Sequence, residues 1–149
     1  MIQRIQSLFL LLATGALGGQ FFAPYLCVGA NDPARAITSL SDGMLTPLDN
    51  PGLLGLTGLG ALISLIAIFL FKNRPLQSRL ALSSAGICVM ITVLLAFTTK
   101  MTLDQTPEGG SIQFAFGVVL PALAIIFNWL AARAIRKDEI LVRSMDRLR

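Results

Sequence analysis

The chain has 149 residues, of which 54% are hydrophobic and only 13% are charged. A soluble domain carries about 25% charged residues, so a soluble fold of this length could not cover its surface, and the sequence predicts one integral membrane domain over residues 1–149. The net charge of +4 would suggest nucleic acid in a soluble protein. Here the basic residues flank apolar stretches, which predicts membrane lipid as a partner and not nucleic acid.

Residues that usually carry chemistry are scarce. Histidine is absent, which removes the commonest general base, metal ligand and haem ligand together. Cys27 and Cys88 form no CxxC pair and are expected to behave as small buried apolar residues. We therefore expect no catalytic residue, no metal site and no cofactor, and predict that the protein is not an enzyme.

Four windows of the sequence lack Asp, Glu, Lys and Arg, namely residues 7–29, 53–71, 80–99 and 112–132. Each is 19 to 23 residues long, and about 20 apolar residues cross a bilayer core as a helix. The sequence thus predicts an all-α fold, an integral membrane bundle of four transmembrane helices. The first window follows Arg4 and resembles a signal peptide, but the chain retains it from Met1 onward, so we interpret it as a true span.

Local signals mark the span ends. Asn50 and Pro51 predict a helix start, because asparagine caps free backbone N–H groups and proline suits the first helical position. Pro75 is expected to end the second span. Pro24 and Pro121 lie inside predicted spans, and Pro121 predicts a bend in the fourth helix because it lacks an N–H group. Such a bend is either static or a transporter hinge.

Small residues are dense in the first two spans, where they predict close helix packing. Gly15 and Gly19 form a GxxxG pattern, and Gly55 and Gly58 lie near the start of the second span. The neighbouring helix belongs either to the same bundle or to another protein.

Polar side chains at membrane depth are few, and we note Gln20, Thr92 and Asn128. None is ionisable, whereas transporters and proton relays usually place ionisable residues inside their spans. In the first loop, Asp32 precedes Pro33 and is expected to cap a short helix. The acidic residues there, Asp32, Asp42 and Asp49, do not have the spacing of a calcium-binding loop.

Lys and Arg are distributed very unevenly along the chain. Ten of the 12 lie in the N-terminus, the second loop or the tail, whereas the first loop has Arg35 and the third has Lys100. Cytoplasmic flanks are enriched in Lys and Arg. The pattern therefore predicts a multi-pass inner-membrane protein with both termini in the cytoplasm.

The C-terminal tail, residues 133–149, has a helical pattern with one mostly apolar stripe and one basic stripe. It predicts a short amphipathic helix at the cytoplasmic surface that contacts either anionic lipid or a protein partner. The residues expected to make this contact are Arg136, Leu141, Arg143, Met145 and Arg147.

Several segments resemble a known family. They are the N-terminal MIQRIQ (residues 1–6), the inner loop KNRPLQ (72–77), and the tail segments AIRKDE (134–139) and SMDRLR (144–149). Together they are similar to domain of unknown function 4293, a family of small four-span membrane proteins of Bacteroidota, over the whole chain. The resemblance implies a bacterial cytoplasmic membrane with the motifs on its cytoplasmic side. It implies no activity, cofactor or catalytic residue.

Two functional hypotheses follow. The first is a non-catalytic accessory or assembly subunit of a larger membrane complex, which contacts other membrane-protein subunits or further copies of itself. The alternative is a small oligomeric transporter or exporter, although proton-driven exporters generally need a carboxylate in the membrane and these spans have none.

Overall fold

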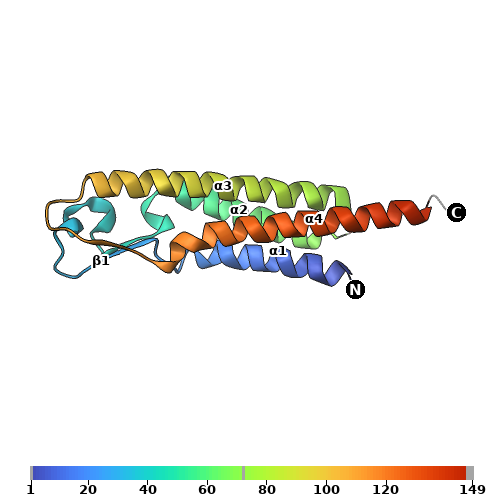
Figure 1. Ribbon diagram of the computed structural model, residues 1–149, viewed down its shortest axis with the longest axis horizontal. Coiled ribbons are helices and arrows are strands. Elements are labelled where there is room, and N and C mark those ends of the chain that lie inside the picture. The colour runs from blue at the N-terminus through green and yellow to red at the C-terminus, as the bar shows by residue number, and fades with distance from the viewer. Residues whose placement is uncertain (1, 72, 147–149) are drawn as a thin grey trace.

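The computed structural model describes residues 2–71 and 73–146, with the side chains of residues 5–71 and 73–142. In these residues, four antiparallel helices lie side by side along the long axis of the molecule (Figure 1). Both ends of the chain lie at one end of the bundle, which we call the termini end, and short strands lie at the other, the sheet end. The helices are α1 (Ile2–Gly19), α2 (Pro51–Phe69), α3 (Arg74–Asp104) and α4 (Leu120–Asp146).

Asparagine caps start two of the helices. The Asn50 side chain accepts hydrogen bonds from the backbone N–H groups of Gly52 (2.9 Å) and Leu53 (3.4 Å), which confirms the predicted start of α2. Asn73 caps α3 by accepting from the Leu76 N–H at 3.3 Å. Pro75 belongs to the first turn of α3, where its missing N–H group has no helical partner to lose.

The first predicted span, residues 7–29, is wrong in its second half. Helix α1 ends at Gly19, turns follow, and Leu26–Val28 form strand β1. Gly18 and Gly19 weaken the helix, and Pro24 disfavours helical backbone in the residue before it. The apolar helical part covers Ile5–Gly19, or about 22 Å at about 1.5 Å per residue. This helix is shorter than a bilayer core of about 30 Å.

The fourth predicted span, residues 112–132, also needs correction. Ile112–Phe114 form strand β3, a 3-10 helix covers Phe116–Val119, and α4 begins only at Leu120. The predicted bend at Pro121 is wrong, because this proline lies in the first turn, where helices tolerate it. The prediction of a separate tail helix is wrong as well, since α4 continues without a break to Asp146. The sequence from 122 to 146 contains neither proline nor glycine to stop it.

The all-α prediction is correct for the bundle but missed a three-stranded sheet. Strand β1 lies between β2 (Met44–Leu45) and β3 and pairs antiparallel with both, so that Leu26 lies opposite Leu45 and Phe114. Gly117 holds the start of α4 against the chain after α1. Its N–H group donates to the Pro24 carbonyl at 3.0 Å, and a side chain at this position would collide with the same carbonyl.

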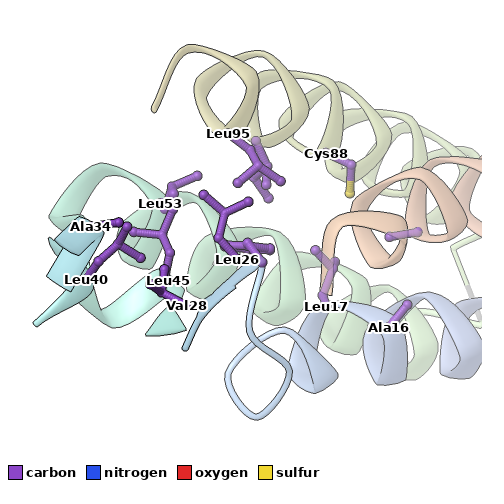
Figure 2. Packing of buried hydrophobic residues seen from close by; sticks show 13 residues of the cluster. Ala16, Leu17, Leu26, Val28, Ala34, Leu40, Leu45, Leu53, Cys88 and Leu95 are labelled. Carbon is purple, nitrogen blue, oxygen red and sulfur yellow. The ribbon is translucent and has the colours of Figure 1, made fainter. Parts of the chain in front are cut away.

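Among the described side chains, two buried apolar clusters fill the interior. The larger one lies towards the sheet end, where Leu26, Leu45, Leu53 and Leu95 gather from strands and helices (Figure 2). The smaller one joins the helices towards the termini end through residues such as Leu10, Ala81 and Ile135. The sheet thus packs onto the bundle and extends its core.

The outer surface of the bundle is apolar, as expected for contact with lipid. Every helix has a large apolar side chain at least half exposed: Leu8 (52%), Leu62 (53%), Val93 (65%) and Ile126 (50%). Within residues 2–71 and 73–146, three helical stretches are long and apolar enough to cross a membrane, namely Pro51–Phe69, Arg74–Asp104 and Phe116–Val142. The chain is therefore a multi-pass membrane protein.

Candidate functional site

Segments far apart in the sequence meet at the termini end. The Gln6 side chain of α1 donates from Nε2 to the Ala134 carbonyl of α4 at 3.2 Å. Arg136 Nε donates to Ser78 Oγ of α3 at 3.3 Å. The Nε atom of Arg74, at the start of α3, lies 3.3 Å from Asp138 Oδ2 of α4. These contacts tie the inner loop and both ends of the chain to one another.

A fourth contact completes this group. Gln77 Nε2 of α3 donates to the Ala67 carbonyl of α2 at 2.9 Å. We call the six side chains the polar belt: Gln6, Arg74, Gln77, Ser78, Arg136 and Asp138. Four of them, Gln6, Gln77, Ser78 and Asp138, are buried. Because a buried polar group without a partner costs about 1–3 kcal/mol, these contacts help to fix how the helices meet.

A groove of about 410 Å³ runs along the outside of α4 beside the polar belt. Its basic part consists of Arg133, Arg136 and Lys137, and its remaining lining is Leu82, Trp129, Ala132 and Ile140. The Arg133 guanidinium carbon lies 5.5 Å from the centre of the Trp129 ring, in a cation–π contact. Trp129 thus lies beside the charges, as indole rings do at the level of lipid headgroups.

Neutral polar side chains join three helices inside the bundle. Ser64 of α2 and Ser84 of α3 have their hydroxyl oxygens 2.7 Å apart. Asn128 of α4 accepts from Ser64 at 3.1 Å and donates to Ser84 at 3.2 Å and to the Ala124 carbonyl at 3.1 Å. All three side chains are fully buried. The trio holds α2, α3 and α4 in register without any ionisable group.

The other polar residues noted in the spans have local partners. Thr92 donates to the carbonyl of Cys88 in its own helix at 2.9 Å. Gln20 Oε1 accepts from the Tyr25 hydroxyl at 2.7 Å. The role of Tyr25 as the partner of Gln20 could not be predicted from the sequence, because the two side chains meet only after the chain turns at the end of α1.

The residues predicted to contact lipid or a partner are only partly described. Arg136 belongs to the polar belt and to the groove, and Leu141 is 41% exposed near the end of α4. Arg143 and Met145 lie in α4, but their side chains are outside the described residues, as is the whole of Arg147. Their role in contacts stays a prediction.

The predicted packing glycines divide into two groups. A methyl group added at Gly19 would lie 3.6 Å from Leu120 of α4, which is ordinary contact between helices of the bundle. At Gly15, Gly55 and Gly58 such a methyl group would meet no described atom within 4 Å beyond its own helix backbone and chain neighbours. Closer packing occurs at Gly60, another small residue of the second span, which lies next to Leu17 and Ile87.

Asp32 connects the two loops of the sheet end. Its Oδ1 accepts from the Ala34 N–H at 2.9 Å, which confirms the predicted cap. Its Oδ2 accepts from the Ser111 N–H (2.8 Å) and hydroxyl (2.7 Å). These hydrogen bonds lower the pKa of Asp32 below its ordinary value, and the one from the Ala34 N–H has the largest effect. Asp42 and Asp49 have partners of their own in Met44 and Thr46.

Comparison with protein families matches residues 2–148 to the family described as Domain of unknown function (DUF4293). The chain belongs to this family. The DUF4293 match confirms the resemblance inferred from the terminal and inner-loop segments. Those segments supply every residue of the polar belt except Ser78, so parts of the DUF4293 sequence that are separated by most of the chain form one structure at the termini end. Comparisons with curated proteins and with solved structures found no match.

Proposed function

We propose that this protein is a non-catalytic accessory or assembly subunit of a larger complex in the bacterial inner membrane, with both termini in the cytoplasm. The observation that carries the proposal is the end of α4. In Figure 1, α4 extends beyond the other helices at the termini end. Arg74, the first residue of α3, already meets Asp138, so the last residues of α4 pass the start of α3.

This projecting end exposes apolar side chains. Ile140 is 68% exposed, Leu141 41% and Val142 36%. They follow Arg133, Arg136 and Lys137, whose charges are expected at the membrane surface. A helix that continues along the bundle axis carries these apolar residues away from the hydrocarbon core. Exposed apolar side chains outside lipid are typical of a surface that a protein partner covers.

The outward glycines support a second contact within the membrane. Gly15 and Gly55 are exposed, and Gly58 is half-buried without a neighbouring side chain. In lipid, helices associate through small residues that allow their backbones to approach closely. The outward sides of α1 and α2 at these glycines are thus suited to a helix of another subunit.

The rival function, a transporter, has less support. The centre of the bundle holds the hydrogen-bonded trio Ser64, Ser84 and Asn128, which is neutral and fully buried. A pathway for ions or protons normally contains ionisable groups at this depth. The buried carboxylate of Asp138 lies at the termini end, beside Arg74.

Native mass spectrometry after extraction in mild detergent tests the proposal, combined with crosslinking in cells. We expect a complex with at least one other membrane protein. The variant Leu141→Ser/Val142→Ser should reduce recovery of this complex at equal expression, because it removes the apolar end of α4. The matched variant Arg133→Gln/Lys137→Gln should retain it. A monodisperse monomer with no crosslinked partner, or equal recovery of the complex from all three proteins, would contradict the proposal.

A further inference from the structure

We infer that the groove beside the polar belt is a binding site for an anionic phospholipid. The phosphate would lie on Arg133, Arg136 and Lys137, and the first part of an acyl chain would lie along Leu82 and Trp129. The inference does not depend on the partner complex proposed above. It stands on the groove's shape, on its basic lining and on its place at the membrane surface.

The charged lining of the groove is entirely basic, and no carboxylate belongs to it. Arg133, Arg136 and Lys137 are exposed and fall at helical spacing on one side of α4. In the described ranges, the one ion pair that the structure shows joins Arg74 to Asp138, outside the groove. Three neighbouring cations on one face attract an anion, and a phosphate diester supplies oxygen acceptors for the guanidinium groups.

The apolar part of the groove indicates that the anion is a phospholipid and not a soluble acidic protein. Leu82 and Ala132 are largely shielded, and Trp129 is 50% exposed. All three lie on the bilayer side of the cations, since Leu82 belongs to the charge-free window of α3 and the other two to that of α4. A soluble acidic protein cannot reach this depth, whereas a phospholipid has its phosphate and its acyl chain at these two levels. Basic pockets between transmembrane helices on the cytoplasmic side bind anionic lipid headgroups.

The size of the groove agrees with a bound headgroup. Its volume of about 410 Å³ lies in the range of about 300–1,000 Å³ found for small-molecule sites. Arg136 is held in place by its hydrogen bond to Ser78, and Arg133 by its contact with Trp129. Two of the three cations are therefore already ordered before a lipid binds, which lowers the entropy lost on binding.

Trp129 is the only tryptophan in the sequence, so its fluorescence reports on this groove alone. The purified protein would be reconstituted in bilayers with a small fraction of brominated phosphatidylglycerol or, separately, brominated phosphatidylcholine. Bromine quenches tryptophan fluorescence on contact. We expect stronger quenching by the anionic lipid at equal mole fraction, with a preference that weakens as salt is added.

Charge-removing variants distinguish specific lipid binding in the groove from a general attraction between anionic lipid and a basic protein. Each basic residue near an anionic surface contributes about 1 kcal/mol, so Lys137→Gln alone should reduce the lipid preference roughly fivefold and Arg133→Gln/Lys137→Gln further. The control Arg79→Gln/Lys100→Gln removes two exposed cations outside the groove and should keep the preference. Equal quenching by both lipids in the unaltered protein would overturn the inference. So would an unchanged preference in Lys137→Gln, or equal losses in the groove variants and the control.

Discussion

Asn128 shows how a single neutral side chain connects three helices. Its amide reaches Ser64 of α2, Ser84 of α3 and the Ala124 carbonyl of α4. Asn128→Ala removes these bonds and leaves a small cavity, so we expect a loss of about 1–2 kcal/mol in the free energy of unfolding. Unfolding in mixed micelles with increasing denaturing detergent measures this loss.

Ser83→Ala is the matched control for Asn128→Ala. Ser83 neighbours Ser84 in α3 but is exposed, so its replacement should change stability very little. If both variants unfold at the same detergent fraction as the unaltered protein, the trio does not contribute to the stability of the bundle.

Asp32 makes the sheet end sensitive to acid. Its pKa is lowered in the folded state by hydrogen bonds from Ala34 and Ser111. A lowered pKa means that this contribution to stability is present above the ordinary pKa of Asp, about 3.9. It is lost as the pH falls through the lower folded value. We expect the protection of the Ser111 amide against hydrogen exchange, corrected for intrinsic rates, to fall on strong acidification.

At neutral pH the variant Asp32→Asn should lose part of this protection, because an amide oxygen accepts these hydrogen bonds more weakly than a carboxylate. Asp104→Asn, at the exposed end of α3, should leave it unchanged. Protection at Ser111 that is the same in Asp32→Asn and the unaltered protein would show that Asp32 does not hold the two loops together.

The role of a residue could be predicted from the sequence where its partner is close along the chain, but not where its partner is far away in the sequence. The caps at Asp32 and Asn50 were predictable because each partner lies within three residues of the cap. The bond from Gln6 to Ala134 joins residues 128 positions apart. Only the packing of α1 against α4 brings these two residues together, and the spacing of residues along the chain does not show which helices pack against each other.

At the scale of elements, the ion pair between Arg74 and Asp138 joins the start of α3 to α4. The Asp138 side chain is 11% exposed and that of Arg74 26%, so the pair is partly shielded from water. Either Arg74→Gln or Asp138→Asn leaves one charge without its partner, and each should destabilise the bundle. We expect the double variant Arg74→Asp/Asp138→Arg to recover part of the loss. The same unfolding assay in micelles measures all three.

A double-mutant cycle with Arg74→Gln and Asp138→Asn gives the coupling between the two side chains. We expect a coupling energy of about 0.5–1 kcal/mol, since one partner is nearly buried and the other is partly exposed. A coupling energy near zero would mean that Asp138 is held by other groups of the polar belt.

The lengths of α1 and α4 were mispredicted for one physical reason. A charge-free window shows that a segment avoids water, but not whether its backbone is helical. Leu26 and Val28 are apolar because β1 buries them in the core at the sheet end, not because they continue α1. The helix boundary is set instead by Gly18, Gly19 and Pro24.

At the scale of the whole molecule, the fold and the charge pattern agree. The bundle places the two termini and the turn between α2 and α3 at one end (Figure 1). Ten of the 12 Lys and Arg residues belong to these segments or their flanks. An antiparallel bundle of four helices brings these basic segments together, as a single cytoplasmic surface requires. The side of the membrane on which this end lies stays a prediction.

Labelling with an impermeant maleimide tests that orientation. Cys27 would first be replaced by alanine, whereas Cys88 is buried and can remain. Ser41→Cys places an exposed thiol in the loop between β1 and β2 at the sheet end, and Arg79→Cys places one near the start of α3. Because the basic end should face the cytoplasm, we expect intact cells to label Ser41→Cys, and Arg79→Cys to react only after permeabilisation. A reporter fused after Arg149 should likewise be active in the cytoplasm. The reverse labelling pattern would place the sheet end inside the cell, and the projecting end of α4 would then meet its partner on the outer side.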